Sequence, residues 1–176
     1  MASQLLIVLV ICAVTTSSMA SPADSSNVDV KKACDEEIKE FHFHVYFFQD
    51  NPQSNKSAEI LFKKIQKLVA GGFFHPVPLR INYKPIGPHV IGSYEVWCPK
   101  EHFSRTYSWF LLNRGPHPVL IHPLTRFEVK DHSERAAWMG QPVPLDLSAL
   151  TPVLDHISSE YPDLGMGYAA PPTSCP

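Results

Sequence analysis

Apolar and polar side chains alternate over Glu40–Phe48, and this period of two predicts a β-strand with two different faces. The apolar face carries Phe41, Phe43, Val45 and Phe47. The opposite face carries His42, His44 and Tyr46. We therefore expect one face of this strand to pack on a core, while the other presents two imidazoles and a phenol.

Two later segments change to the period of a helix. In the first, Asp50-Asn51-Pro52 breaks the strand, Ser54 or Asn55 can cap the helix, and Gly71-Gly72 ends it. Its apolar stripe consists of Ala58, Leu61, Phe62, Ile65, Leu68 and Val69. The second helix is expected to begin at Cys98-Pro99 and to end at Gly115. Its stripe consists of Phe103, Tyr107, Phe110 and Leu111.

Three further strands are predicted at about Leu79–Lys84, Gly92–Trp97 and His117–His122. The order strand, helix, strand, strand, helix, strand predicts an α+β, ferredoxin-like βαββαβ domain. Its antiparallel four-stranded sheet carries both helices on one face. The other face must be covered by a second subunit, the C-terminal region or a ligand. We expect the first and fourth strands to share that open face without being neighbours in the sheet.

The ends of the chain differ from this domain. A turn of helix is expected within Val30–Lys39 and a short helix from Thr151 to about Tyr161. Pro162–Pro176 is rich in Pro and Gly and is expected to be loose. The predicted organisation is a signal peptide at 1–20, a flexible leader at 21–39, the folded domain at 40–161 and a tail at 162–176.

The first twenty residues have the features of a secretory signal peptide. An apolar run, Leu5–Val14, is followed by the small-residue exit Ser18-Met19-Ala20. The run is short for a membrane span, so stable membrane insertion is not expected, and a single anchor helix is the alternative. We expect the protein to be secreted or to lie in the lumen of the secretory pathway.

The charge of the chain limits its expected binding partners, and its cysteine content limits its possible disulfides. The chain of 176 residues has a net charge of −2 and no basic cluster, which argues against nucleic acid as a partner. Removal of residues 1–20 leaves three cysteines, Cys34, Cys98 and Cys175. In an oxidising compartment we expect Cys34 to pair with Cys98 or Cys175, which leaves one free thiol.

More histidines are expected to reach the open face of the sheet: His89, His122 and His132. Their settings are a stiff Gly87-Pro88 turn, a strand end fixed by Pro123, and a polar loop beside Asp131. The other four, treated as structural or exposed, are His75, His102, His117 and His156.

Glu95 is expected on the same face as the histidines if its neighbour Val96 faces the core. A histidine-rich site with at most one carboxylate favours iron(II), zinc or copper over calcium or magnesium. Each of these signals, taken alone, also fits an ordinary polar strand face or a surface loop.

The ordered set of motifs resembles the DOPA 4,5-dioxygenase family over about Phe41–Leu147. The segments that carry the resemblance are Phe41-His42-Phe43-His44-Val45-Tyr46-Phe47, Ile86-Gly87-Pro88-His89, Tyr94-Glu95-Val96, Leu112-Asn113-Arg114-Gly115, Val119-Leu120-Ile121-His122-Pro123-Leu124-Thr125, Asp131-His132 and Trp138-Met139-Gly140. The resemblance implies a ferredoxin-like protein, usually a homodimer, with extradiol dioxygenase activity on L-DOPA or another catechol, using iron(II) and O2.

The resemblance also implies a pocket that contains His42, His44, His89, His122 and His132, with Tyr46 and Glu95 nearby. We hypothesise that His44 and His122 are metal ligands, joined by His89 or His42, because His44, His89 and His122 are rigidly held. Glu95 is the one carboxylate placed to join them. Proton transfer and substrate orientation are assigned to His132, His42 and Tyr46. His132 is placed in this second set because it lies in a longer loop.

Two other functions stay open. One is a secreted, non-catalytic protein of the same fold that binds a catechol, a pigment or a metal. The other is a purely structural or interaction domain, in which the histidines bind nothing.

Overall fold

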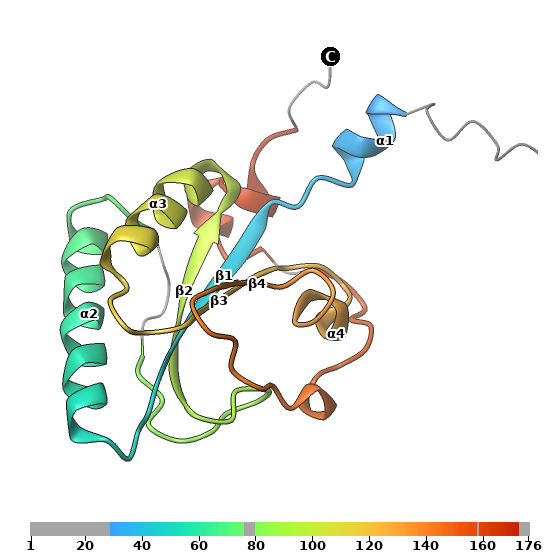
Figure 1. The fold of residues 1–176 in the computed structure, drawn as a ribbon. Helices are drawn as coiled ribbons and strands as arrows, with labels where there is room; N and C mark the ends of the chain where they lie inside the picture. Colours follow the sequence, from blue (N-terminus) through green and yellow to red (C-terminus); the bar gives the residue numbers. More distant parts are fainter. Residues whose placement is uncertain (1–28, 76–79, 158, 173–176) are drawn as a thin grey trace, which may run out of the picture.

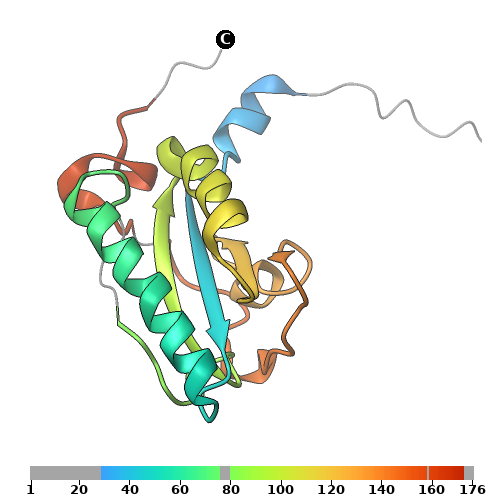
Figure 2. The same cartoon turned by 60° about the vertical axis from the view of Figure 1, so that its left-hand side comes forward.

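The computed structural model describes residues 29–75, 80–157 and 159–172. They form an α+β fold in which a four-stranded antiparallel sheet carries two main helices on one face (Figure 1 and Figure 2). The strands are β1 (Glu40–Phe47), β2 (Gly92–Pro99), β3 (Val119–Pro123) and β4 (Ala137–Met139). The main helices are α2 (Pro52–Ala70) and α3 (Phe103–Asn113). The predicted signal peptide and residues 21–28 of the predicted leader lie outside the described residues.

Short helices complete the structure. They are α1 (Val30–Asp35), η1 (Lys100–His102), α4 (Glu128–Asp131), η2 (Leu147–Ala149), η3 (Pro162–Leu164) and η4 (Gly167–Ala169). The turn of helix expected within Val30–Lys39 is thus present as α1. Within the described residues, no helix combines the length and the apolar character needed to cross a membrane.

The core lies between the sheet and the two main helices. The apolar face of β1 supplies Phe43, Val45 and Phe47, all buried, as the alternation predicted. The α2 side of this core contains Ala58, Leu61, Phe62 and Ile65. These side chains recur at helical spacing, so their burial holds α2 against the sheet.

Helix α2 begins at Pro52, which is earlier than expected, because the predicted cap was Ser54 or Asn55. Asn51 is the N-cap, because its side-chain oxygen accepts hydrogen bonds from the backbone N–H groups of Gln53 and Ser54. Pro52 therefore occupies the first helical position, where its missing N–H costs nothing. The helix ends at Ala70 with Gly71 as C-cap, as predicted.

The predicted second strand does not form over the described part of Leu79–Lys84. Only Asn82 pairs with the sheet, in a single antiparallel bridge to Ser93 of β2. The fourth strand of the sheet is instead Ala137–Met139, which pairs with β3. This strand is three residues long and lacks an alternating pattern, so no periodicity predicted it.

The expectation that the first and fourth predicted strands are not neighbours is wrong. The fourth predicted strand, seen as β3, pairs directly with β1, and the sheet order is β2-β1-β3-β4. As a result β1 is a central strand with a partner on each side. Its histidines therefore meet side chains from both neighbours.

The C-terminal region also differs from expectation. No helix forms over Thr151–Tyr161 in its described part, because the backbone N–H groups there bind elsewhere. Thr151 donates to the Glu128 carboxylate, and Leu154 donates to the Arg126 carbonyl. The tail is not loose as far as residue 172, since Tyr161 and Gly167 are buried and two 3-10 helices form.

One of the two disulfide alternatives is excluded. Cys34 is disulfide-bonded, whereas Cys98 is a free thiol buried in the core. Pairing of Cys34 with Cys98 is therefore wrong. The other predicted partner, Cys175, lies outside the described residues.

Candidate metal centre

The register of the three longest strands brings the site residues together. On β1, His42 lies between Trp97 of β2 and His122 of β3. Two residues further along the same face, His44 lies beside Glu95 of β2. The opposite face of β2 sends Tyr94, Val96 and Cys98 into the core, so Glu95 faces the histidines as expected.

Two loops add the remaining histidines. His89 closes a tight turn with Ile86, in which Gly87 adopts a φ of +52°, and it also pairs with Leu145. His132 directly follows α4. All five predicted site histidines are therefore in one cluster, although their positions in the sequence span 91 residues (132 minus 42, plus one).

The imidazoles are close enough to share a metal ion. The Nε2 atoms of His44 and His122 are 3.0 Å apart. Two nitrogens bound at right angles to one cation, each at about 2.1 Å, would themselves be about 3.0 Å apart. The ring centroids of His122 and His132 are 3.9 Å apart, and those of His44 and His89 are 4.2 Å apart.

Two groups of three histidines have ligand atoms that all lie within 4.8 Å of one another. One group is His42, His44 and His122, and the other is His44, His89 and His132. His44 belongs to both. Among the described residues, Glu95 belongs to neither group, and the hypothesised trio of His44, His89 and His122 is not one of them.

Hydrogen bonds to Nδ1 fix the rings so that Nε2 faces the cluster. His122 donates from Nδ1 to the Pro123 carbonyl at 2.9 Å, and His132 donates from Nδ1 to the Glu128 carbonyl at 2.9 Å. The Nδ1 atom of His89 lies 2.6 Å from the Tyr46 hydroxyl, which can accept its proton. Metal-binding histidines usually hold the second ring nitrogen in this way, because it fixes the tautomer and leaves the other lone pair free.

Asp131 does not orient its neighbour His132. Asp131 is buried and accepts hydrogen bonds from Thr125 and from the Arg135 guanidinium. It thereby fixes the loop that contains α4. The backbone carbonyl of Glu128 orients His132 instead.

Burial keeps the histidines neutral at pH 7. Desolvation lowers the pKa of His42 and of His89 to about 4. It lowers the pKa of His44 and of His122 well below the usual value, and the other imidazoles of the cluster lower it further. Neutral imidazoles crowded in this way have lone pairs available for a cation, which would also relieve the crowding.

His42 has a different partner from the other four. Its Nε2 lies 2.7 Å from Oε1 of Glu160, a residue of the C-terminal segment. Burial, followed by the nearby Glu40 and Glu95 charges, raises the pKa of Glu160 to about 9. Because the pKa of His42 is about 4, both groups are neutral at pH 7. The contact is thus a hydrogen bond from a protonated carboxyl group to His42 rather than an ion pair.

Glu95 and Tyr46 adjoin the cluster. One oxygen of Glu95 lies 3.9 Å from Nδ1 of His42 and 4.0 Å from Nδ1 of His44. Tyr46 is fully buried, and this burial raises the pKa of its phenol, which therefore keeps its proton at pH 7. Tyr46 is thus positioned to orient His89, whereas Glu95 lies beyond hydrogen-bond distance of both imidazoles.

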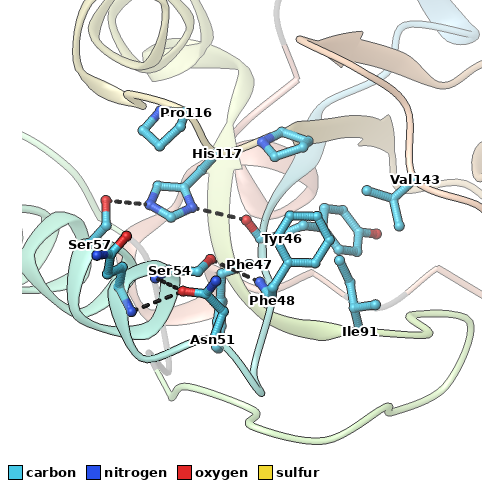
Figure 3. Close-up of a pocket in the computed structure, with 12 residues that line it drawn as sticks. Tyr46, Phe47, Phe48, Asn51, Ser54, Ser57, Ile91, Pro116, His117 and Val143 are labelled. Carbon is cyan, nitrogen blue, oxygen red and sulfur yellow. Dashed lines mark hydrogen bonds between the residues drawn. The ribbon is translucent and has the colours of Figure 1, made fainter.

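The described pockets differ in chemistry. The larger, about 430 Å³, lies behind Tyr46 and is lined mainly by apolar side chains such as Phe47, Ile91 and Val143 (Figure 3). It contains no charged residue and no histidine of the cluster. Its own histidine, His117, is hydrogen-bonded on both ring nitrogens, to the Tyr46 carbonyl and to Ser57, which confirms its structural role.

A smaller pocket of about 180 Å³ opens onto two histidines of the cluster. His44, His89 and Glu95 line it, together with Arg80 and Asn82. A third pocket, of about 300 Å³, is lined by His132 beside apolar side chains such as Trp138 and Leu145. We place the chemistry of the site in the pocket of about 180 Å³, because among the described pockets it alone combines histidines of the cluster with charged side chains.

Sequence reasoning missed Glu160, Arg80 and Trp97. The alternation of β2 places Trp97 on the same face as Glu95, and its ring stacks on His42 at 5.8 Å between centroids. Glu160 and Arg80 lie in irregular segments, where no period indicates which way a side chain points. Only the folded chain brings these two to the site.

The fold and the site define a small α+β protein with a buried, histidine-rich centre suited to a transition-metal ion. Residues 41–149 match the Dopa 4,5-dioxygenase family. The chain belongs to this family, as its motifs indicated.

Individual relatives agree with this assignment. A DOPA 4,5-dioxygenase of Amanita muscaria is 44% identical over 143 residues, which is 81% of this chain and 63% of that protein. An uncharacterised 21.2 kDa protein of Botryotinia fuckeliana is 38% identical over 117 residues, 61% of each chain. The chain therefore spans just under two thirds of the length of these relatives.

A solved structure supports the fold. A crystal structure from Nostoc punctiforme, provisionally described as that of a dioxygenase, superimposes with a TM-score of 0.51 at 28% identity. The match covers 64% of this chain and 90% of that one.

Proposed function

We propose that this protein is an extradiol dioxygenase that uses iron(II) and O2 to cleave the ring of DOPA or a related catechol. The observation that carries the proposal is the cluster of neutral imidazoles around His44, in which partners hold Nδ1 of His89, His122 and His132, and the Nε2 atoms of His44 and His122 lie 3.0 Å apart. The 44% identity to a DOPA 4,5-dioxygenase supports the choice of reaction.

His44 is the central ligand in this proposal, because it belongs to both groups of three. His122, His89 and His132 complete the candidate ligands, since a partner holds Nδ1 of each. This arrangement favours His132 as a ligand in place of the proton-transfer role that its loop position suggested. It leaves Glu95, 4.0 Å from Nδ1 of His44, outside the ligand set, because Glu95 belongs to neither group of three.

Iron(II), when bound, would coordinate the two catechol oxygens and allow electrons to pass from the ring to O2. The protein supplies a site that excludes water, since His44, His89 and His122 are buried. It also supplies proton carriers, because a catechol must lose protons on binding and the cleaved product must gain one.

His42 and Glu160 are the proton carriers in this proposal. Glu160 holds a proton at pH 7 and is hydrogen-bonded to Nε2 of His42. When His42 releases its Nδ1 proton into the site, it can take the Glu160 proton at Nε2. His42 thus acts as the general acid, and Glu160 replaces its proton.

The test is direct. The chain without residues 1–20 would be loaded with iron(II) in the absence of oxygen and then given L-DOPA and O2. We expect oxygen uptake and a yellow ring-cleaved product, and neither in His44→Ala. If no product forms from several catechols, the dioxygenase proposal is wrong. Tight binding of L-DOPA or iron without oxygen uptake would instead identify a non-catalytic binding protein.

We further propose the finer features expected from the sequence: a ferredoxin-like architecture with its edge strand reduced to the Asn82–Ser93 bridge, a homodimer, and secretion. Both main helices on one face of the sheet support the first. Light scattering on the purified chain tests the second. Recovery of a chain beginning at Ser21 from the culture medium of expressing eukaryotic cells tests the third.

A further inference from the structure

Arg80 has no polar partner in the part of the chain that the structure describes. Its guanidinium makes no hydrogen bond or ion pair with any described residue. The other four arginines, all described, each donate at least one hydrogen bond: Arg105, Arg114, Arg126 and Arg135. Arg80 is therefore the one arginine here whose charge and five donors are not already used in holding the fold.

The position of this free guanidinium is specific. Arg80 lines the pocket of about 180 Å³ that also contains His44, His89 and Glu95. Asn82, two residues later, lines the same pocket and is held to the sheet through its bridge to Ser93. The bridge anchors the segment that carries Arg80 beside the histidine cluster.

Glu95 does not neutralise Arg80. The two side chains line one pocket, yet they form no ion pair at 4.0 Å or less, and the nearest charged or titratable contacts of Glu95 are His42 and His44. The pocket thus presents a cation that is free to pair with an anion from outside. A planar guanidinium is well suited to a carboxylate, which it binds through two parallel hydrogen bonds.

We propose that Arg80 determines substrate specificity by binding a carboxylate on the side chain of the catechol. This inference rests on the proposed function, in which the catechol oxygens face the histidines. The side chain of the substrate then extends along the pocket toward Arg80. Catechols with an acidic side chain are the preferred substrates, and uncharged or purely cationic catechols are poor ones.

The experiment compares four catechols that share the ring and differ in the charged groups of the side chain. L-DOPA and 3-(3,4-dihydroxyphenyl)propanoate carry a carboxylate, whereas dopamine and 4-methylcatechol do not. Binding to the iron-loaded protein is measured without oxygen by calorimetry, and oxygen uptake is measured separately. The variants are Arg80→Met and, as control, Lys84→Met, which removes an exposed positive charge of the same segment that does not line the pocket.

We expect Arg80→Met to weaken binding of both carboxylates by about 10-fold or more, as for loss of a charge-assisted hydrogen bond. Binding of dopamine and 4-methylcatechol is expected to change by less than about twofold. Lys84→Met should leave all four unchanged, and Arg80→Lys should restore part of the carboxylate binding. An equal loss for all four catechols, or no loss for the carboxylates, would overturn the proposal.

The two readouts separate this inference from the proposed function. Carboxylate binding that depends on Arg80, without oxygen uptake by the wild type, supports the role of Arg80 and refutes the dioxygenase. Oxygen uptake with an unchanged preference in Arg80→Met refutes the role of Arg80 alone. If the wild type binds none of the four catechols, both proposals are wrong.

Discussion

At the scale of single residues, the site depends on what holds each imidazole. His122 and His132 donate their Nδ1 protons to backbone carbonyls, and Tyr46 lies beside Nδ1 of His89. His42 alone is bonded through Nε2 to a protonated carboxyl group. Identical side chains are thereby divided into candidate metal ligands and a candidate proton carrier.

Iron content tests this division. His44→Ala should abolish bound iron, because His44 belongs to both candidate groups of ligands, and His132→Ala should lower it strongly. His156→Ala, an exposed histidine outside the cluster, is the matched control and should leave iron unchanged. Metal analysis after anaerobic loading measures the result. Full iron in His132→Ala together with lost turnover would restore the proton-transfer role to that residue.

Replacement of the proton carrier should separate metal binding from catalysis. We expect His42→Gln to retain iron and to lower turnover about 100-fold, the usual effect of losing a general acid. Glu160→Gln should keep the hydrogen bond but cannot supply a proton, so it should also lower turnover. Loss of iron in His42→Gln would show that the group of His42, His44 and His122 is the metal site.

The depressed histidine pKa values predict how stability depends on pH in the metal-free protein. The unfolded chain binds protons at its histidines near pH 6.5, whereas folded His42 and His89 bind them only near pH 4. The contribution of these two histidines to the free energy of unfolding is therefore fully present above pH 6.5 and is lost as the pH falls toward 4. Each of these two histidines accounts for at most about 3 kcal/mol.

Thermal unfolding from pH 8 to pH 4 in the presence of a chelator measures this loss. His42→Gln should show a shallower decline below pH 6.5. Glu160 acts in the opposite sense, since its raised pKa favours folding at low pH and loses that contribution as the pH rises toward 9. The Glu160→Gln variant removes this opposing contribution, and an unchanged melting temperature of that variant between pH 6.5 and pH 4.5 would contradict the assignment of neutral buried histidines.

At the scale of elements, several hydrogen bonds from the C-terminal segment converge on one buried carboxylate at the start of β1. Glu40 accepts hydrogen bonds from the Ser159 hydroxyl and from the backbone N–H groups of Glu160 and Tyr168. The tail is thereby fixed on the open face of the sheet, and Glu160 is brought to His42. A second subunit, the C-terminal region or a ligand was expected to cover that face, and the C-terminal region covers part of it.

A pair of glycines tests this attachment. Gly167 has a φ of +58°, and a Cβ there would overlap the Glu40 carboxyl group, whereas Gly165 has a φ of +59° with nothing within 4 Å. Gly165→Ala should cost about 1 kcal/mol of backbone strain. Gly167→Ala should cost about 1–3 kcal/mol more, because it also forces Glu40 aside. Chemical denaturation measures both, and equal losses would show that the contact with Glu40 is unimportant.

At the scale of the whole molecule, the oxidation state of the cysteines shows which of them form covalent links. Cys34 is disulfide-bonded and Cys98 is buried as a free thiol, whose pKa burial raises to about 12. The chain from Ser21 onward, unfolded without reducing agent, should therefore show one reactive thiol. Cys98→Ser should remove it. Three thiols in the unfolded chain would contradict an oxidised protein.

The sequence by itself determined the elements that have a clear period and the residues that lie on them. Alternation over Glu40–Phe47 predicted β1 and the face of its histidines, and helical spacing predicted α2, because these periods follow from local backbone geometry. The prediction of α3 was right only in part, since Tyr107 and Leu111 of its expected stripe are exposed and Cys98-Pro99 ends β2 instead of starting the helix. The motifs also determined the family and the five clustered histidines. Each of those histidines lies on a strand, in a stiff turn or beside a recognisable motif.

Only the tertiary structure decided which of these groups touch. The pairing of β1 with β3 places His122 opposite His42, with its Nε2 atom 3.0 Å from that of His44, and strand pairing depends on contacts that are distant in sequence. The positions of Arg80, Glu160 and β4 were undetermined for the same reason, since irregular or very short segments carry no period. Their side chains are placed by the partners that they meet in the folded chain, such as the Glu40 carboxylate that fixes the backbone of Glu160.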